Sequence, residues 1–112
     1  MTDPDSPEVA DLEAAAEWRR RKVDANPSDQ QSAVAAQRLQ QLADDLRQLQ
    51  ASPLYREYGA ICNWLAESDD ISDFAQLAHE YRQRIGIDAL PETAEDYLRA
   101  LVDISRRMFG AP

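Results

Sequence analysis

Apolar residues recur along most of the chain in alternating steps of three and four, a spacing that places them on one face of an α-helix. The narrowest of these faces lies in the second of five such segments and consists of Ala35, Leu39, Leu42, Leu46 and Leu49. An apolar seam of this width is typical of a helix that packs against a single partner helix. The pattern predicts a series of helices, one of which is paired along its length.

Local start and stop signals divide the first half of the chain into two helices. Ser6 followed by Pro7 is typical of a helix start, because serine can cap free amides and proline fits the first helical position. Pro27 breaks this helix, and Ser28 stands three residues before a glutamine, which is the spacing of a capping box. Residues 6–51 are therefore predicted to form an αα-hairpin.

Three further helices are expected, over about residues 53–67, 72–85 and 91–109. Serine and threonine cap the free amides of a helix start, and glycine readily adopts the left-handed conformation that ends a helix. The signals that bound the three helices are Ser52 with Pro53, Ser72, Gly86, Pro91 or Thr93, and Gly110.

The expected fold is an all-α compact helical bundle of about five helices in a single domain over residues 6–112. No alternating run of β-branched residues indicates a strand. All four Tyr and both Phe residues lie within residues 53–109, so we place the main, aromatic-containing core there and treat the hairpin as the thinner element. Residues 1–5 are polar and include a proline, which predicts a disordered N-terminus.

The chain is acidic, with 21 Asp and Glu against 12 Lys and Arg and a formal net charge of -9. Direct binding to nucleic acid is therefore disfavoured, because phosphates would repel the protein. No apolar run approaches the roughly 20 residues of a membrane span, and the first residues lack the features of a signal peptide. A single cysteine suits a reducing compartment, so we expect a cytoplasmic protein; the many arginines and alanines are typical of bacterial sequences.

No group of residues in the sequence indicates catalysis, a cofactor site or a metal site, and we expect a protein that is not an enzyme. Cys62 has apolar neighbours at helical spacing and is interpreted as a small core residue. His79 is the single histidine and falls away from the apolar face of its helix, so it is expected to be exposed. The acidic residues between the third and fourth helices lack the glycine and distal glutamate of an EF-hand; they are Glu67, Asp69, Asp70 and Asp73.

Trp18 lies about 140° from the centre of the apolar face of the first helix, with Ala14 one turn before it and Lys22 one turn after it. Two interpretations remain open. The first helix could be enclosed between the second helix and the last three, which would bury Trp18. Alternatively, Trp18 is an interface anchor, because tryptophan concentrates binding energy in protein interfaces.

The cationic run at residues 19–22 is interpreted as a solvated helix face, because the cations lie toward the helix C-terminus, where the helix dipole favours them. An acidic protein partner is the alternative. On the third helix, Tyr55 and Trp64 flank the apolar face, which suits either a central helix of the bundle or a groove or dimer face. Gly59 would be explained by a close helix crossing.

We therefore expect a small non-catalytic interaction, adaptor or regulatory module that docks helix faces onto a protein partner or onto a second copy of itself. One alternative is an acidic inhibitor of a basic target, such as an antitoxin, an immunity protein or a nucleic-acid mimic. Another is a small protein that binds an apolar ligand among the aromatic residues of the last three helices. The candidate interface residues are Ala14, Trp18, Lys22, Leu39, Leu42, Leu46, Tyr55 and Trp64.

Overall fold

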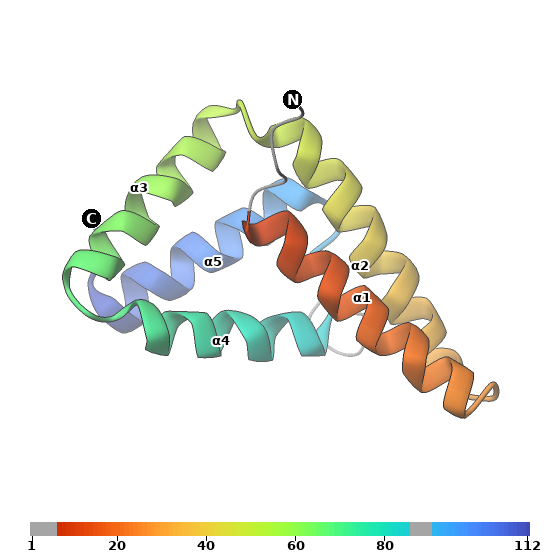
Figure 1. The fold of residues 1–112 in the computed structure, drawn as a ribbon. Coiled ribbons are helices and arrows are strands. Elements are labelled where there is room, and N and C mark those ends of the chain that lie inside the picture. The colour runs from red at the N-terminus through yellow and green to blue at the C-terminus, as the bar shows by residue number, and fades with distance from the viewer. Residues whose placement is uncertain (1–6, 86–90) are drawn as a thin grey trace, which may run out of the picture.

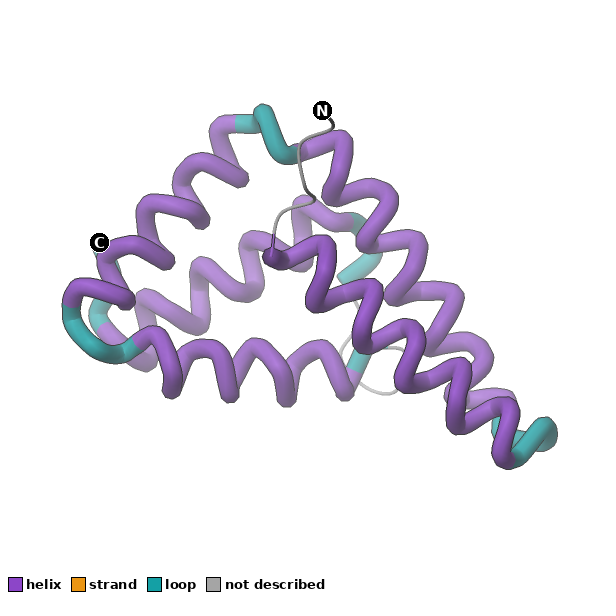
Figure 2. Tube along the Cα trace, in the orientation of Figure 1, coloured by secondary structure: helices purple, strands orange, loops and turns teal. Residues whose placement is uncertain are grey.

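The computed structural model describes residues 7–85 and 91–112, which form five helices (Figure 1). They are α1 (Pro7–Ala25), α2 (Gln30–Leu49), α3 (Pro53–Glu67), α4 (Ile71–Arg84) and α5 (Ala94–Phe109). The described residues contain helices and loops and no strand (Figure 2). The prediction of an all-α helical bundle is confirmed. The expected disorder of residues 1–5 and the expected stop at Gly86 lie outside the described residues.

Several helix boundaries follow from the predicted capping residues. The Ser52 hydroxyl accepts a hydrogen bond from the Tyr55 amide at 3.2 Å, and the Thr93 hydroxyl accepts one from the Asp96 amide at 3.1 Å. These bonds satisfy amides that have no partner within the first turn of a helix. Gly110 ends α5 with a φ of 72°, the left-handed conformation that glycine adopts at little cost.

Two predicted caps are wrong. The N-cap of α2 is Asp29, whose carboxylate accepts hydrogen bonds from both the amide and the hydroxyl of Ser32, whereas Ser28 donates its hydroxyl to Asn26. A carboxylate with two local donors competes better for the cap position than a neighbouring hydroxyl. The fourth helix begins at Ile71, before the predicted cap at Ser72, and its N-cap Asp70 makes no side-chain capping bond.

The five helices enclose a single hydrophobic core. α1 and α2 form the predicted antiparallel hairpin, whose tip projects beyond the other helices (Figure 1). Both α2 and α3 pack against α5, and α4 contacts α3 and α1. All five helices contribute to one cluster of buried residues, which includes Leu12, Leu46, Leu65, Phe74 and Tyr97. The core therefore extends beyond residues 53–109, because the hairpin supplies a continuous part of it. None of the described helices is long and apolar enough to cross a membrane.

The close helix crossing that would have explained Gly59 is absent, because a Cβ atom placed on it would meet no atom within 4 Å apart from its chain neighbours and the backbone of its own helix. We predict that Gly59→Ala raises the free energy of unfolding by about 0.5–1 kcal/mol, since alanine loses less backbone freedom on folding into a helix. Gly110→Ala should lower it by about 1 kcal/mol, because this position has a positive φ. Urea unfolding followed by circular dichroism measures both changes, and a destabilised Gly59→Ala variant would contradict the prediction.

Candidate functional site

A concave site lies between α3 and α4 and forms a groove with a volume of about 760 Å³. We call it the α3–α4 groove. The two helices diverge from the turn at residues 68–70, and the start of α1 lies across the open end (Figure 1). Its lining is mostly apolar and consists of Pro7, Glu8, Asp11, Tyr55, Arg56, Tyr58, Gly59, Ala60, Cys62, Asn63, Ile71, Phe74, Ala75, Ala78 and Arg82.

The short turn between the two helices keeps the groove open. Asp69 adopts a φ of 61°, and the Asp70 amide donates a hydrogen bond to the Leu65 carbonyl at 2.9 Å. A left-handed residue that follows a helix reverses the chain and satisfies carbonyls of the last helical turn. In the reversed α4, the side chains of Phe74 and Ala78 are buried, whereas Ala75 is exposed and Ile71 is half-buried in the groove.

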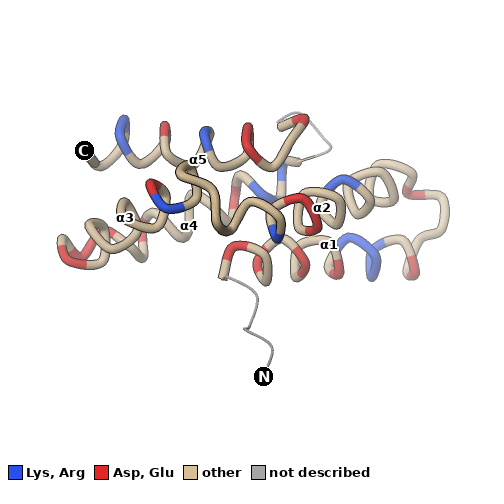
Figure 3. Tube along the Cα trace, turned by 90° about the horizontal axis from the view of Figure 1, so that it is seen from above, with Lys and Arg blue, Asp and Glu red and all other residues tan. Residues whose placement is uncertain are grey.

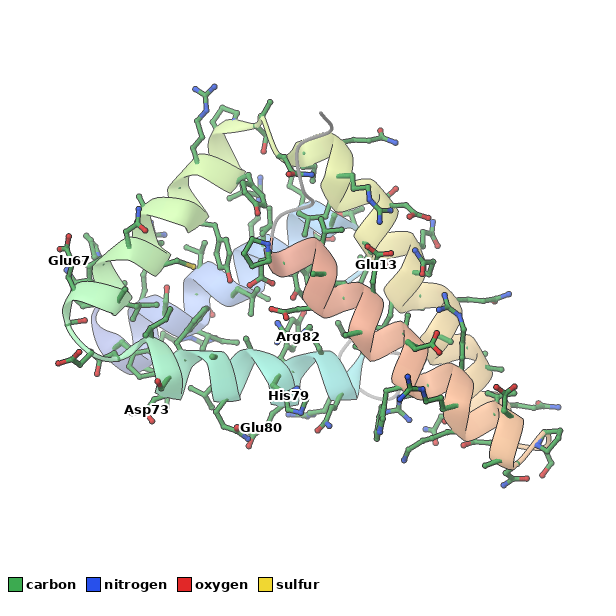
Figure 4. All side chains as sticks on the ribbon, viewed as in Figure 1. Glu13, Glu67, Asp73, His79, Glu80 and Arg82 are labelled. Atoms are coloured by element: carbon green, nitrogen blue, oxygen red, sulfur yellow. The ribbon has the colours of Figure 1, made fainter. Side chains whose placement is uncertain are left out.

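The end of the groove at α1 is closed by a buried polar group, the Glu8 cluster, which comprises Glu8, Tyr58, Arg82 and Tyr97. The Glu8 carboxylate accepts a hydrogen bond from the Tyr58 hydroxyl through Oε1 and one from the Tyr97 hydroxyl, at 2.8 Å, through Oε2. Arg82 reaches from α4 toward the start of α1 (Figure 4), with its Nη1 atom 3.6 Å from Glu8 Oε2 and 3.3 Å from the Tyr97 hydroxyl. The cluster thus joins α1, α3, α4 and α5.

Asp11 extends the cluster toward solvent. Its Oδ2 atom lies 3.7 Å from Arg82 Nη2, and its side chain is exposed. Asp11 and Arg82 also line a second cavity of about 320 Å³ between α1 and α4, together with Trp18 and His79. This ion pair therefore separates the α3–α4 groove from the smaller cavity.

Burial keeps the hydroxyls of Tyr58 and Tyr97 and the thiol of Cys62 in their neutral forms. Desolvation raises the pKa values of Tyr58 and Tyr97 well above the ordinary tyrosine value, and the charge of Glu8 raises both further. Both phenols therefore remain hydrogen-bond donors at neutral pH. Desolvation also raises the pKa of the Cys62 thiol, which makes Cys62 a poor nucleophile. The groove is suited to binding apolar groups and offers no activated nucleophile.

The structure does not bring the candidate interface residues together on one surface. Leu39, Leu42 and Leu46 are at most 2% exposed, so the seam of α2 is covered within the chain and is not available to a partner. Tyr55 lines the α3–α4 groove, whereas Trp64 is half-buried against the core and does not line it. The seam is closed because α2 packs against both α1 and α5, while its pattern had indicated one partner helix.

Ala14, Trp18 and Lys22 remain near one another on α1. Trp18 is 39% exposed, so the bundle does not enclose it as one interpretation had it. The Lys22 Nζ atom lies 4.2 Å from the centre of the Trp18 ring, and the Arg19 guanidinium lies 4.8 Å from it. These cations cover part of the indole through cation–π contacts. The Trp18 surface is therefore less apolar than the sequence indicates.

Arg19 departs from the expected solvated cationic face, because it is only 7% exposed. Its guanidinium donates hydrogen bonds to the Gln83 carbonyl at 2.6 Å and to the Ser32 hydroxyl at 3.3 Å. The carbonyls of the last helical turn have no partner within the helix and carry partial negative charge, so a cation is favourable at the end of α4. The other cations of the run, Arg20, Arg21 and Lys22, are exposed as expected.

Sequence reasoning missed Glu8 and Arg82. One signal could have identified Arg82. It lies four residues after Ala78, which lies four residues after Phe74, so the three residues share one face of α4. A cation on this buried face is expected to be buried or paired. Glu8 lies in the first turn of α1, where the helix dipole favours any carboxylate, so its local sequence gives no signal of its burial. His79 is exposed, as predicted. Within residues 7–85 and 91–112, no group of three or more His, Cys, Asp or Glu residues is placed to hold a metal ion.

Arg82→Met should lower the free energy of unfolding by about 3 kcal/mol, because it leaves the buried Glu8 carboxylate without its cation. The matched control is Arg99→Met, which removes an exposed ion pair with Glu95 and should change stability by less than about 0.5 kcal/mol. Urea unfolding of the wild type and both variants measures the difference. Equal stabilities of the two variants would show that the Glu8 cluster does not hold the helices together.

The raised tyrosine pKa values predict a loss of stability at high pH. Above pH about 10 the unfolded chain releases the two phenolic protons that the folded chain keeps, so stability falls as pH rises. Each buried tyrosine should contribute a slope of about 1.4 kcal/mol per pH unit. Tyr58→Phe should reduce the slope measured by urea unfolding between pH about 10 and 11. The same slope in variant and wild type would contradict the assignment of Tyr58.

Comparison with known proteins shows no relationship that bears on function. No protein-family model matches the chain, and neither a curated protein nor a solved structure matches it significantly. A functional assignment therefore depends on the chemistry and shape of the α3–α4 groove and of the surfaces around it.

Proposed function

We propose that the protein is a non-catalytic interaction module that receives one amphipathic helix of a protein partner in the α3–α4 groove. The observation that supports this proposal is the apolar lining left uncovered between two diverging helices, including Ile71, Ala75 and Tyr55. A helix that buries its apolar face there gains about 25 cal/mol for each Å² of apolar surface removed from water. The α3 wall, 15 residues long, offers roughly 22 Å of length along which such a helix can lie.

The charges around the groove favour a partner helix with a basic polar face. Acidic residues gather at the turn between α3 and α4 and at the adjoining ends of both helices (Figure 3); they are Glu67, Asp69, Asp70 and Asp73. Figure 4 shows Glu67 and Asp73 at this end of the molecule. Within the described part of the chain, none of these four carboxylates forms an ion pair. Together with the net charge of -9, they would speed the approach of a basic helix and disfavour an acidic one.

The Glu8 cluster gives the groove a fixed end. Glu8 and Arg82 hold the start of α1 across the mouth of the groove, and Tyr58 presents its ring to the groove while its hydroxyl is bonded to Glu8. The Tyr58 ring also contacts Phe74, with ring centres 6.3 Å apart. Because aromatic side chains held in this way lose little entropy on binding, they form a preorganised apolar surface.

A displayed library of amphipathic helical peptides with randomised polar faces tests the proposal. Selected peptides should carry Lys or Arg on the polar face and should slow the alkylation of Cys62 by iodoacetamide, since Cys62 is the single cysteine and lines the groove. Ala75→Arg should weaken their binding at least about tenfold by filling the groove and repelling cations. Ala33→Arg, which adds the same side chain at an exposed site on α2, should leave binding unchanged.

Two results would contradict the groove as the binding site. Selected peptides could bind the Ala75→Arg variant as tightly as the wild type, or they could leave the alkylation rate of Cys62 unchanged. Peptide binding that is unaffected by Ala75→Arg and is lost in high salt would instead favour the acidic inhibitor, because salt screens long-range attraction between exposed charges.

The size of the groove favours a second candidate function, the binding of a small apolar ligand. Its volume of about 760 Å³ lies within the roughly 300–1,000 Å³ of small-molecule sites. Such a ligand would also slow the alkylation of Cys62, but the ligands that bind would show no preference for basic groups. A thermal-shift screen with small apolar compounds, repeated on Ala75→Arg, separates this function from helix binding.

A further inference from the structure

The second cavity lies between α1 and the C-terminal half of α4 and has a volume of about 320 Å³; we call it the α1–α4 cavity. Its α1 wall consists of Asp11, Ala14, Ala15 and Trp18, which are spaced by three and four residues and share one face of the helix. Because alanine side chains are short, the middle of this wall leaves space between the two helices. The volume lies near the lower limit of small-molecule sites, roughly 300 Å³, so the cavity fits a ligand of few atoms.

The α1–α4 cavity contains a buried hydrogen-bond donor whose counter-ion is too distant to accept from it. Arg82 is 7% exposed, and its Nη1 atom donates a hydrogen bond to the Tyr97 hydroxyl. Its Nη2 atom makes no hydrogen bond within the described residues, since the Asp11 carboxylate lies 3.7 Å away. The other carboxylate near Arg82, that of Glu8, does not line this cavity. A buried donor without an acceptor is costly, so a ligand that supplies an acceptor to Nη2 is favoured.

Charges of both signs surround the α1–α4 cavity. The titratable residues in its lining are Asp11, His79 and Arg82, the last two of which Figure 4 shows on α4. Arg19 and Lys22 place two further cations beside the Trp18 ring. A simple anion would be repelled by Asp11, and a simple cation would be repelled by Arg82 and by the two cations beside Trp18. A molecule that carries a carboxylate and an ammonium group close together matches both signs.

We propose that the α1–α4 cavity binds a free α-amino acid with an apolar side chain. The ligand carboxylate accepts hydrogen bonds from Arg82 Nη2 and from the His79 imidazole, which carries an N–H donor in either protonation state. The ligand ammonium group pairs with the Asp11 carboxylate, whose side chain is 49% exposed and accepts no hydrogen bond within the described residues. The apolar side chain packs against Ala14 and Trp18.

This site is separate from the proposed helix site. Ala14, Trp18 and His79 line the α1–α4 cavity and do not line the α3–α4 groove. A residue within a peptide chain carries neither of the two charges that the cavity matches. The binding of a free amino acid therefore does not depend on the proposed helix binding, although Asp11 and Arg82 form the wall between the two cavities.

Nuclear magnetic resonance of the ¹⁵N-labelled protein tests the proposal with L-phenylalanine, titrated from about 0.1 mM to about 20 mM. The indole N–H signal of Trp18 should move and saturate, whereas that of Trp64 should not, because Trp64 does not line the cavity. A Trp18→Phe variant assigns the two signals. Phenylethylamine lacks the carboxylate and 3-phenylpropanoate lacks the ammonium group, so each should bind at least about tenfold more weakly.

Substitutions in the α1 wall test the position of the ligand. Ala14→Leu should raise the Kd of L-phenylalanine at least about tenfold by filling the cavity, whereas Ala10→Leu, at an exposed position of α1 outside the cavity, should leave it unchanged. Asp11→Asn should remove the preference for L-phenylalanine over 3-phenylpropanoate, because it removes the partner of the ammonium group. The amide signals of each variant show whether it is folded.

Three results would each overturn the proposal. They are a Trp18 signal that does not saturate with L-phenylalanine, equal binding of L-phenylalanine and either analogue to the wild type, and an unchanged Kd in Ala14→Leu. Equal binding of 3-phenylpropanoate would show a simple anion site instead. Peptides selected for the groove should bind Ala14→Leu as they bind the wild type, so a failure of this proposal is distinguishable from a failure of the helix site.

Discussion

The buried carboxylate of Glu8 is the interaction on which the arrangement of the helices depends. An ionised carboxylate loses its hydration when it is buried, and this loss must be offset by hydrogen bonds and an opposite charge. Tyr58, Tyr97 and Arg82 provide both, and they come from α3, α5 and α4. Because one side chain satisfies groups from three other helices, the start of α1 is held in a single position. That position closes one end of the α3–α4 groove.

The local part of this architecture could be predicted from the sequence, and its long-range part could not. Helix number and the caps at Ser52, Thr93 and Gly110 depend on neighbouring residues only, and they are confirmed. The contacts of Glu8 with Tyr58 and Tyr97 join residues 50 and 89 positions apart. Periodicity gives the side of a helix on which a residue lies, but it does not say which helix meets it there.

The candidate site shows the same division. One alternative hypothesis placed an apolar ligand among the aromatic residues of the last three helices, and Tyr55 and Tyr58 do line the groove. Tyr81 and Tyr97 instead stack on each other at 5.8 Å, away from the groove lining. The groove exists because the turn at Asp69 sets the angle between α3 and α4, and the sequence did not indicate that angle. The α2 seam was misjudged for a related reason, since two helices, α1 and α5, share it.

The position of α4 explains why the proposed binding groove lies along this helix. α3 packs against α5, whereas α4 approaches α3 and α1 and is tied to the bundle partly through polar contacts. Arg82 joins α4 to Glu8, and Arg19 bonds the Gln83 carbonyl near its end. A helix held in this way needs less apolar cover than one held by packing alone, and α4 leaves Ile71 and Ala75 uncovered in the groove. A ligand that covers these residues would therefore add to the stability of the bundle, because it binds only the folded chain.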